Sequence, residues 1–123
     1  MSKEITVNLK VEVKNGFLAQ SFSPGTVLVD MSGTTATGGV QDIGTSTNAE
    51  ALSMSDVSSA GWAWFRNCDT TNYVDIGSGT GTNFAPVIRL KAGEVAALRL
   101  ATNAPTARAN TAAVKLLYNI LAD

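Results

Sequence analysis

Residues 5–13 read Ile-Thr-Val-Asn-Leu-Lys-Val-Glu-Val, so apolar and polar side chains alternate at every position. Successive side chains of a β-strand point to opposite faces of its sheet, and this spacing predicts a strand from Ile5 to Lys14 with one apolar face. The pair Asn15-Gly16 follows, which favours the type I′ turn of a tight hairpin. We therefore expect residues 17–22 to return as the second strand of a hairpin.

Short segments of the same kind continue along the chain. After a predicted turn at residues 23–25, strands are expected at residues 26–31, 40–45, 60–67, 73–77, 84–90, 95–101 and 114–121. Residues 49–54 fit a short strand or one helical turn, and residues 107–109 fit an edge strand. Residues 32–39 hold no large apolar side chain and are expected to form a mobile loop. This pattern predicts one all-β domain over residues 1–123, an antiparallel β-sandwich of jelly-roll type.

Charge is scarce and balanced. Charged residues make up 15% of the 123 residues and the net charge is −1, whereas about a quarter of a soluble chain is usually charged. A nucleic-acid site needs clustered Lys and Arg, so we predict no nucleic-acid partner. No apolar run approaches the length that spans a bilayer, which predicts no membrane partner. No apolar leader precedes the first strand, and synthesis in the cytoplasm is expected.

Few residues suit catalysis. The chain has no His and a single Cys, Cys68, which has no base to activate it. Six scattered carboxylates could still meet in space as a glycosidase pair, namely Asp42, Glu50, Asp56, Asp69, Asp75 and Glu94. None stands in a recognisable catalytic motif. We predict a protein without enzymatic activity and without a cofactor.

Two loops hold residues that often bind ligands. The run Gly77-Ser78-Gly79-Thr80-Gly81 is rich in glycine, like a phosphate-binding loop, but a strand rather than a helix is expected after it, which favours a hairpin loop. Asn67, Asp69 and Thr71 alternate, with Asp75 nearby, as oxygen ligands of calcium can. Turns use the same residues to cap their own backbone. We predict a turn and no metal.

Several apolar residues fall on strand faces that should meet water. In the last strand Val114, Leu116, Tyr118 and Ile120 share one face, while Leu117 and Leu121 lie on the other. Neighbouring patches of this kind indicate an interface with another subunit, although loops of the same chain are an alternative cover. The predicted interface residues are Leu28, Val87, Val95, Leu117 and Leu121. We expect a homo-oligomer, with a trimer favoured.

Trp62 and Trp64 share one face of a predicted strand. If that face points outward, the two rings form a possible ligand platform for a sugar or a protein. If it points inward, they belong to the core, to which two Trp side chains would contribute much of the buried area.

The second half of the chain resembles a known group of proteins. The residues that carry the resemblance are Trp64–Gly77, Phe84–Glu94 and Val114–Ile120, within residues 60–121. They are similar to the strand–turn–strand segments of small virion proteins of tailed bacteriophages, which resemble jelly rolls. The resemblance implies a structural protein located in the virion, most directly a capsid decoration or cement subunit bound to the phage capsid protein. The alternative that it implies is a receptor- or carbohydrate-binding module of a tail or fibre.

Overall fold

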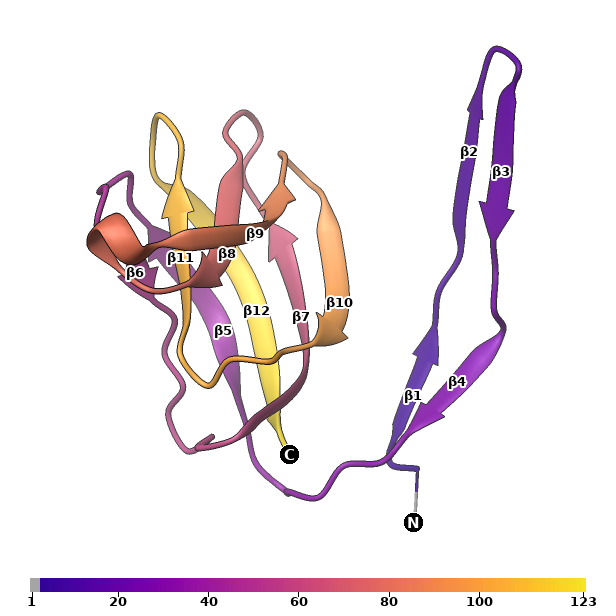
Figure 1. Cartoon of the computed structure of the whole chain (residues 1–123), viewed down its shortest axis with the longest axis horizontal. Coiled ribbons are helices and arrows are strands. Elements are labelled where there is room, and N and C mark those ends of the chain that lie inside the picture. The colour runs from indigo at the N-terminus through magenta and orange to yellow at the C-terminus, as the bar shows by residue number, and fades with distance from the viewer. Residues whose placement is uncertain (1–2) are drawn as a thin grey trace. The chain divides into compact units, whose positions relative to one another are not determined.

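The computed structural model describes residues 3–123, which form strands and one short 3₁₀ helix, η1 (Gly81–Asn83) (Figure 1). The chain divides into two compact units, residues 1–32 and residues 33–123. We call the described part of the first unit, residues 3–32, the arm, and the second unit the body. The expectation of one domain stays a prediction. No helix among residues 3–123 has the length and apolar character needed to cross a membrane.

The arm is a two-stranded antiparallel ribbon in two halves (Figure 1). Its strands are β1 (Ile5–Asn8), β2 (Val11–Asn15), β3 (Leu18–Phe22) and β4 (Thr26–Val29). β2 pairs with β3 and β1 pairs with β4, so the expected first strand is interrupted at residues 9–10. At this break, residues 9–10 of the first strand lie opposite residues 23–25 of the returning strand, so two residues face three. Pro24, in the middle of the three, has no N–H to donate to a strand pair. The expected turn at residues 23–25 is therefore a break within one returning strand.

The hairpin turn differs from the expected type. Asn15 pairs with Leu18, which leaves Gly16 and Phe17 as the two loop residues. Gly16 has φ 59°, and Phe17 is not among the residues with positive φ. A type I′ turn needs positive φ at both central positions, whereas a type II′ turn needs it only at the first. The prediction of a type I′ turn was wrong, because a side chain with a Cβ occupies the second position.

The body contains two four-stranded antiparallel sheets. The first sheet has the order β10-β7-β12-β5 and the second has the order β6-β11-β8-β9. The strands are β5 (Ala36–Ile43), β6 (Glu50–Ala51), β7 (Ala60–Asn67), β8 (Val74–Ser78), β9 (Ala85–Leu90), β10 (Val95–Arg99), β11 (Pro105–Ala109) and β12 (Val114–Ala122). Pairing is nested, since β5 pairs with β12, β6 with β11, β7 with β10 and β8 with β9.

Both sheets contribute to a single buried core. The first sheet supplies Phe65, Leu116 and Ile120, and the second supplies Val74 and Ile76, all of them almost completely buried. In the first sheet, Phe65, Leu116 and Ile120 belong to rows of buried residues that alternate with less buried ones along β7 and β12, as the sequence predicts. Full burial of one such side chain contributes about 1.5–3 kcal/mol, so this shared core is the main source of the body's stability.

Two expectations about small residues were wrong. Ala36–Gly39 was expected in a mobile loop, but these residues open β5 and pair with the end of β12. At Gly38 a Cβ would collide with the Tyr118 carbonyl, so the lack of a side chain permits this close pairing. Residues 105–109 form β11, which is an inner strand between β6 and β8 rather than an edge strand. Sequence patterns that depend on large apolar side chains cannot detect such strands.

Asn67 joins the end of β7 to its surroundings. Its side chain is completely buried, and its Nδ2 donates hydrogen bonds to the carbonyls of Asn72 (2.8 Å) and Leu90 (2.9 Å). Its Oδ1 accepts from the backbone N–H of Asp69 (2.9 Å). Leu90 ends β9 in the second sheet, so one amide ties the two sheets together where the chain crosses between them.

Replacement of this amide should destabilise the body. Asn67→Ala leaves several buried or half-buried backbone groups without partners, and each such group costs about 1–3 kcal/mol. We expect a loss of about 3 kcal/mol or more in the free energy of unfolding, measured by denaturant titration with circular dichroism. Asn83→Ala, at an exposed position in η1, is the matched control. Equal stability of the two variants would contradict the role assigned to Asn67.

Candidate docking surface

The outward side of the first sheet carries a band of apolar side chains. Register places Leu117 between Arg66 and Val40, Val95 beside Arg66, and Trp64 between Ala97 and Asn119. Residues paired directly across an antiparallel sheet point to the same face, so these side chains share one surface. We call this surface the outer band; its exposed members are Val40, Trp64, Val95 and Leu117, and its half-buried members are Trp62 and Leu121.

Ion pairs lie at the two ends of the outer band. Lys115 Nζ is 2.9 Å from Asp42 Oδ1 at one end, and Arg99 Nη1 is 3.0 Å from Asp123 Oδ2 at the other. The hydrogen bond to Asp42, with the attraction of its charge, raises the pKa of Lys115. Arg66, which is exposed, also lies within the band between Val95 and Leu117, so this face is largely apolar with one internal charge and ion pairs at its ends.

One polar group within this face lacks a partner. Asn119 Oδ1 is the only buried side-chain oxygen or nitrogen without a hydrogen bond among the described residues. Asn119 pairs with Trp64 on β7 and Gly38 on β5, in the middle of the outer band. A buried acceptor without a donor costs about 1–3 kcal/mol.

The five predicted interface residues come from three parts of the molecule, namely the two sheets of the body and the arm. Val95, Leu117 and Leu121 lie on the outer face of the first sheet. Val87, 82% exposed, is in β9 of the second sheet, and Leu28 is in the arm. Trp62 and Trp64 both face outward, with Trp64 45% exposed, so they are outside the core. Val40 was missed because its face depends on the pairing of β5 with Leu117, which the sequence does not reveal.

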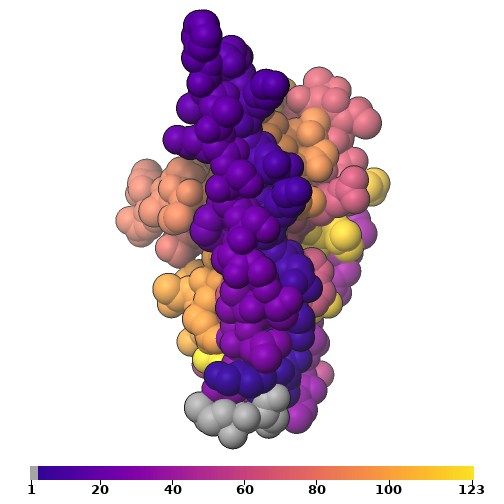
Figure 2. Space-filling view, turned by 90° about the vertical axis from the view of Figure 1, so that its right-hand side faces the viewer, coloured from indigo at the N-terminus to yellow at the C-terminus, as the bar shows by residue number. Residues whose placement is uncertain are grey.

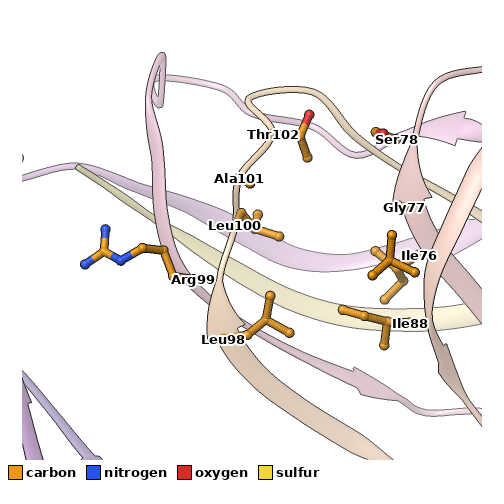
Figure 3. Close-up of a pocket in the computed structure, with 10 residues that line it drawn as sticks. Ile76, Gly77, Ser78, Ile88, Leu98, Arg99, Leu100, Ala101 and Thr102 are labelled. Atoms are coloured by element: carbon orange, nitrogen blue, oxygen red, sulfur yellow. The ribbon is translucent and has the colours of Figure 1, made fainter.

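An apolar pocket lies where two edge strands face each other. β9 ends the second sheet and β10 ends the first, and a pocket of about 380 Å³ opens between them. Figure 3 shows Ile76, Ile88, Leu98 and Leu100 around the pocket, with Arg99 pointing away. The pocket could not be predicted from the sequence, because it depends on which strands are at the edges of the two sheets.

The scattered carboxylates bind groups of their own chain. Glu50 accepts a hydrogen bond from the Gly44 N–H (2.6 Å), and Glu94 accepts one from the Lys91 N–H (2.8 Å). Asp75, which is buried, forms a two-pronged ion pair with Arg89, whose guanidinium stacks over the Tyr73 ring at 3.9 Å. Within residues 3–123 no group of three or more His, Cys, Asp or Glu side chains could hold a metal ion.

The Asn67–Asn72 segment is a turn, in which side-chain oxygens accept hydrogen bonds from the segment's own backbone. Asp69 Oδ2 accepts from the backbone N–H groups of Thr71 (3.0 Å) and Asn72 (2.6 Å). These hydrogen bonds, the one from Asn72 first, lower the pKa of Asp69. The glycine-rich loop that follows β8 contains the three-residue η1 and leads into β9, in agreement with the strand expected after it.

Comparison with known proteins adds no relative. No protein-family model, no curated protein and no solved structure matches this chain. The candidate docking surface is therefore defined by the register of its strands, the exposure of its apolar side chains and its charged ends.

The Asp69 turn makes a pH-dependent contribution to stability. A carboxylate whose pKa is lower in the folded chain stabilises it above the ordinary value of 3.8, and this stabilisation is lost as the pH falls through the folded-state pKa. Asp69→Asn keeps an acceptor oxygen but removes the charge. We expect a lower melting temperature than wild type at pH 7, with the gap closing well below pH 3.8, in thermal melts followed by circular dichroism.

Asp56→Asn, at an exposed carboxylate, is the charge-matched control for this experiment. A gap between wild type and Asp69→Asn that stays constant from neutral to acidic pH would show that the charge of Asp69 has no part in the turn.

Proposed function

We propose that β5–β12 form a jelly-roll sandwich. Six of the seven connections between these consecutive strands change sheet, and only β8 and β9 follow each other within one sheet. Together with the nested pairing, this is what results when one long hairpin, with its tip between β8 and β9, wraps into two layers. Jelly rolls have eight strands in two sheets and occur in viral capsid and lectin domains.

We further propose that the chain is a non-enzymatic structural subunit of a bacteriophage virion, synthesised in the host cytoplasm. The most direct form of this proposal is a decoration or cement subunit on the outer surface of the capsid. The observation that carries it is the outer band, a largely apolar sheet face with ion pairs at its ends and Arg66 within it. The resemblance of residues 60–121 to small virion proteins supports the choice of partner, the phage capsid protein.

The proposed mechanism is contact. Trp64, the largest exposed side chain of the outer band, is its expected anchor, because buried aromatic side chains dominate the binding energy of interfaces. A specific interface of standard size buries roughly 1,600 Å² in total, to which one sheet face and its flanking loops can contribute half. Repetition of the contact over many capsid sites, or through an oligomer such as a trimer, would add avidity.

The test is binding of the purified chain to capsids that lack it. Trp64→Lys should lower the number of copies bound per particle by at least about tenfold, because it places a charge at the centre of the interface. Bound copies are counted by quantitative mass spectrometry. Val87→Lys, at a more exposed apolar position on the other sheet, is the matched control and should bind like wild type.

One outcome would overturn the capsid location, and another would overturn the choice of docking surface. Only a few copies per virion would indicate a tail or vertex component instead. Loss of binding in Val87→Lys but not in Trp64→Lys would move the docking surface from the first sheet to the second.

The second candidate is a receptor- or carbohydrate-binding module. It is favoured by the outward position of Trp62 and Trp64, two residues apart on one strand face, where aromatic rings can stack on a sugar. On this reading, polysaccharide from the host surface quenches Trp fluorescence, and Trp64→Ala abolishes the quenching. Unchanged fluorescence at saturating polysaccharide would exclude it.

A further inference from the structure

The arm has no core of its own. None of residues 3–32 is buried, and each of its four strands pairs on one side only. Phe17 at the turn is fully exposed, and Val11, Leu18 and Phe22 are about half exposed. Figure 2 shows the arm in indigo and violet as a narrow ribbon of side chains. An isolated two-stranded ribbon is at best marginally stable in water, so an ordered arm needs a covering surface.

The register separates the arm into chemically different faces. We call the half formed by β2 and β3 the outer half. There Val11 pairs with Phe22, Val13 with Gln20 and Asn15 with Leu18, and all six side chains share one face. The opposite face holds the pairs Glu12–Ser21 and Lys14–Ala19. In the other half, the pairs Ile5–Val29 and Val7–Val27 share one face. In the half formed by β2 and β3, only the face with Val11 and Phe22 lacks a charged residue in its ladder. In the half formed by β1 and β4, the opposite face holds the pairs Thr6–Leu28 and Asn8–Thr26 and is also without charge, but it has one apolar residue where the Ile5–Val29 face has four. We call the Val11–Phe22 face and the Ile5–Val29 face the uncharged faces.

We propose that the arm is a self-association element, whose uncharged faces pack against the same faces of the arm in another copy of this chain. This inference rests on the arm alone and does not depend on the proposed capsid partner. The outcome is a symmetric oligomer in which two-stranded ribbons become the layers of a small sandwich, with sheets about 10 Å apart.

Charge makes a second copy the fitting occupant. In a two-fold symmetric contact each residue of one face meets a residue of the same face in the copy, so a charged side chain would be buried against uncharged neighbours or, near the symmetry axis, against its own equivalent. The uncharged faces contain none, whereas Glu12 and Lys14 stay in water on the other side. The polar side chains of the outer-half face are Asn15 and Gln20, whose amides both donate and accept and can therefore pair with the same amides of a copy.

The size of the surface also fits. The second ribbon has the same length, width and twist as the first, so the two uncharged faces match in size and curvature. The two halves together offer eight apolar side chains per copy on the uncharged faces, from Ile5, Val7, Val11, Val13, Leu18, Phe22, Val27 and Val29. Interfaces between subunits that are permanently associated have apolar centres of this kind.

The test compares two single substitutions in the full chain. Val13→Lys places a charge on the uncharged face, and Ser21→Lys places the same charge on the opposite face of the same ribbon. Molar mass is measured by light scattering during size-exclusion chromatography. Wild type and Ser21→Lys should have the mass of an oligomer, a multiple of 12.8 kDa, while Val13→Lys should have the monomer mass. The dissociation constant should rise at least roughly 100-fold in Val13→Lys.

Folding of the body is checked in the same samples by Trp fluorescence, because both Trp residues lie in β7 and outside the arm. A monomeric wild type would overturn the proposal and indicate that a different partner covers the arm. Retention of the oligomer in Val13→Lys, or its loss in Ser21→Lys as well, would also overturn it. None of these results depends on whether the chain binds capsids, so the two proposals fail separately.

Discussion

Every strand has two faces, and this constraint governs the whole molecule. Within a two-layer body, each sheet can bury only one of its faces. The alternation in β7 and β12 sends Phe65, Leu116 and Ile120 inward, yet Trp64 and Leu117, which are next to Phe65 and Leu116 in sequence, are apolar as well. An apolar residue on the second face gains nothing from folding, because it stays in water. Its stabilising contribution arises only when another surface covers it, and for this reason we propose that the chain assembles.

Much of the fold could be predicted from the sequence, because large apolar residues spaced by two mark strands. The alternating segments at residues 60–67, 84–90 and 114–121 all correspond to observed strands. The sequence pattern failed where small residues form strands, as at Ala36–Gly39 and Pro105–Ala109, since their pairing depends on close backbone approach rather than on apolar bulk. The ribbon break at residues 9–10 also escaped detection, because a perfect alternation continues through it.

The candidate surface could be predicted only in part, for a related reason. Alternation assigns a residue to a face, but the order of strands decides which faces are neighbours. Leu117 and Val95 were correctly assigned to an outward face, and strand order brings them together on one sheet. The same reasoning assigned Val87 to an outward face, but strand order puts it on the other sheet. The sequence singled out Asn67 as a turn residue or calcium ligand, but not as the tie between the sheets, because that role comes from three hydrogen bonds to distant or turn backbone, which no local pattern encodes.

The nested pairing has a consequence for biosynthesis. β12, residues 114–122, lies between β5 and β7 and supplies hydrogen bonds to both. Until the ribosome has made these nine residues, β5 and β7 have a gap between them, and their apolar sides have no finished layer to face. The body must therefore close late and through contacts between distant parts of the chain, a topology that folds slowly. The arm is translated first, so in a polysome the nascent ribbons of neighbouring chains are available to one another before any body has closed.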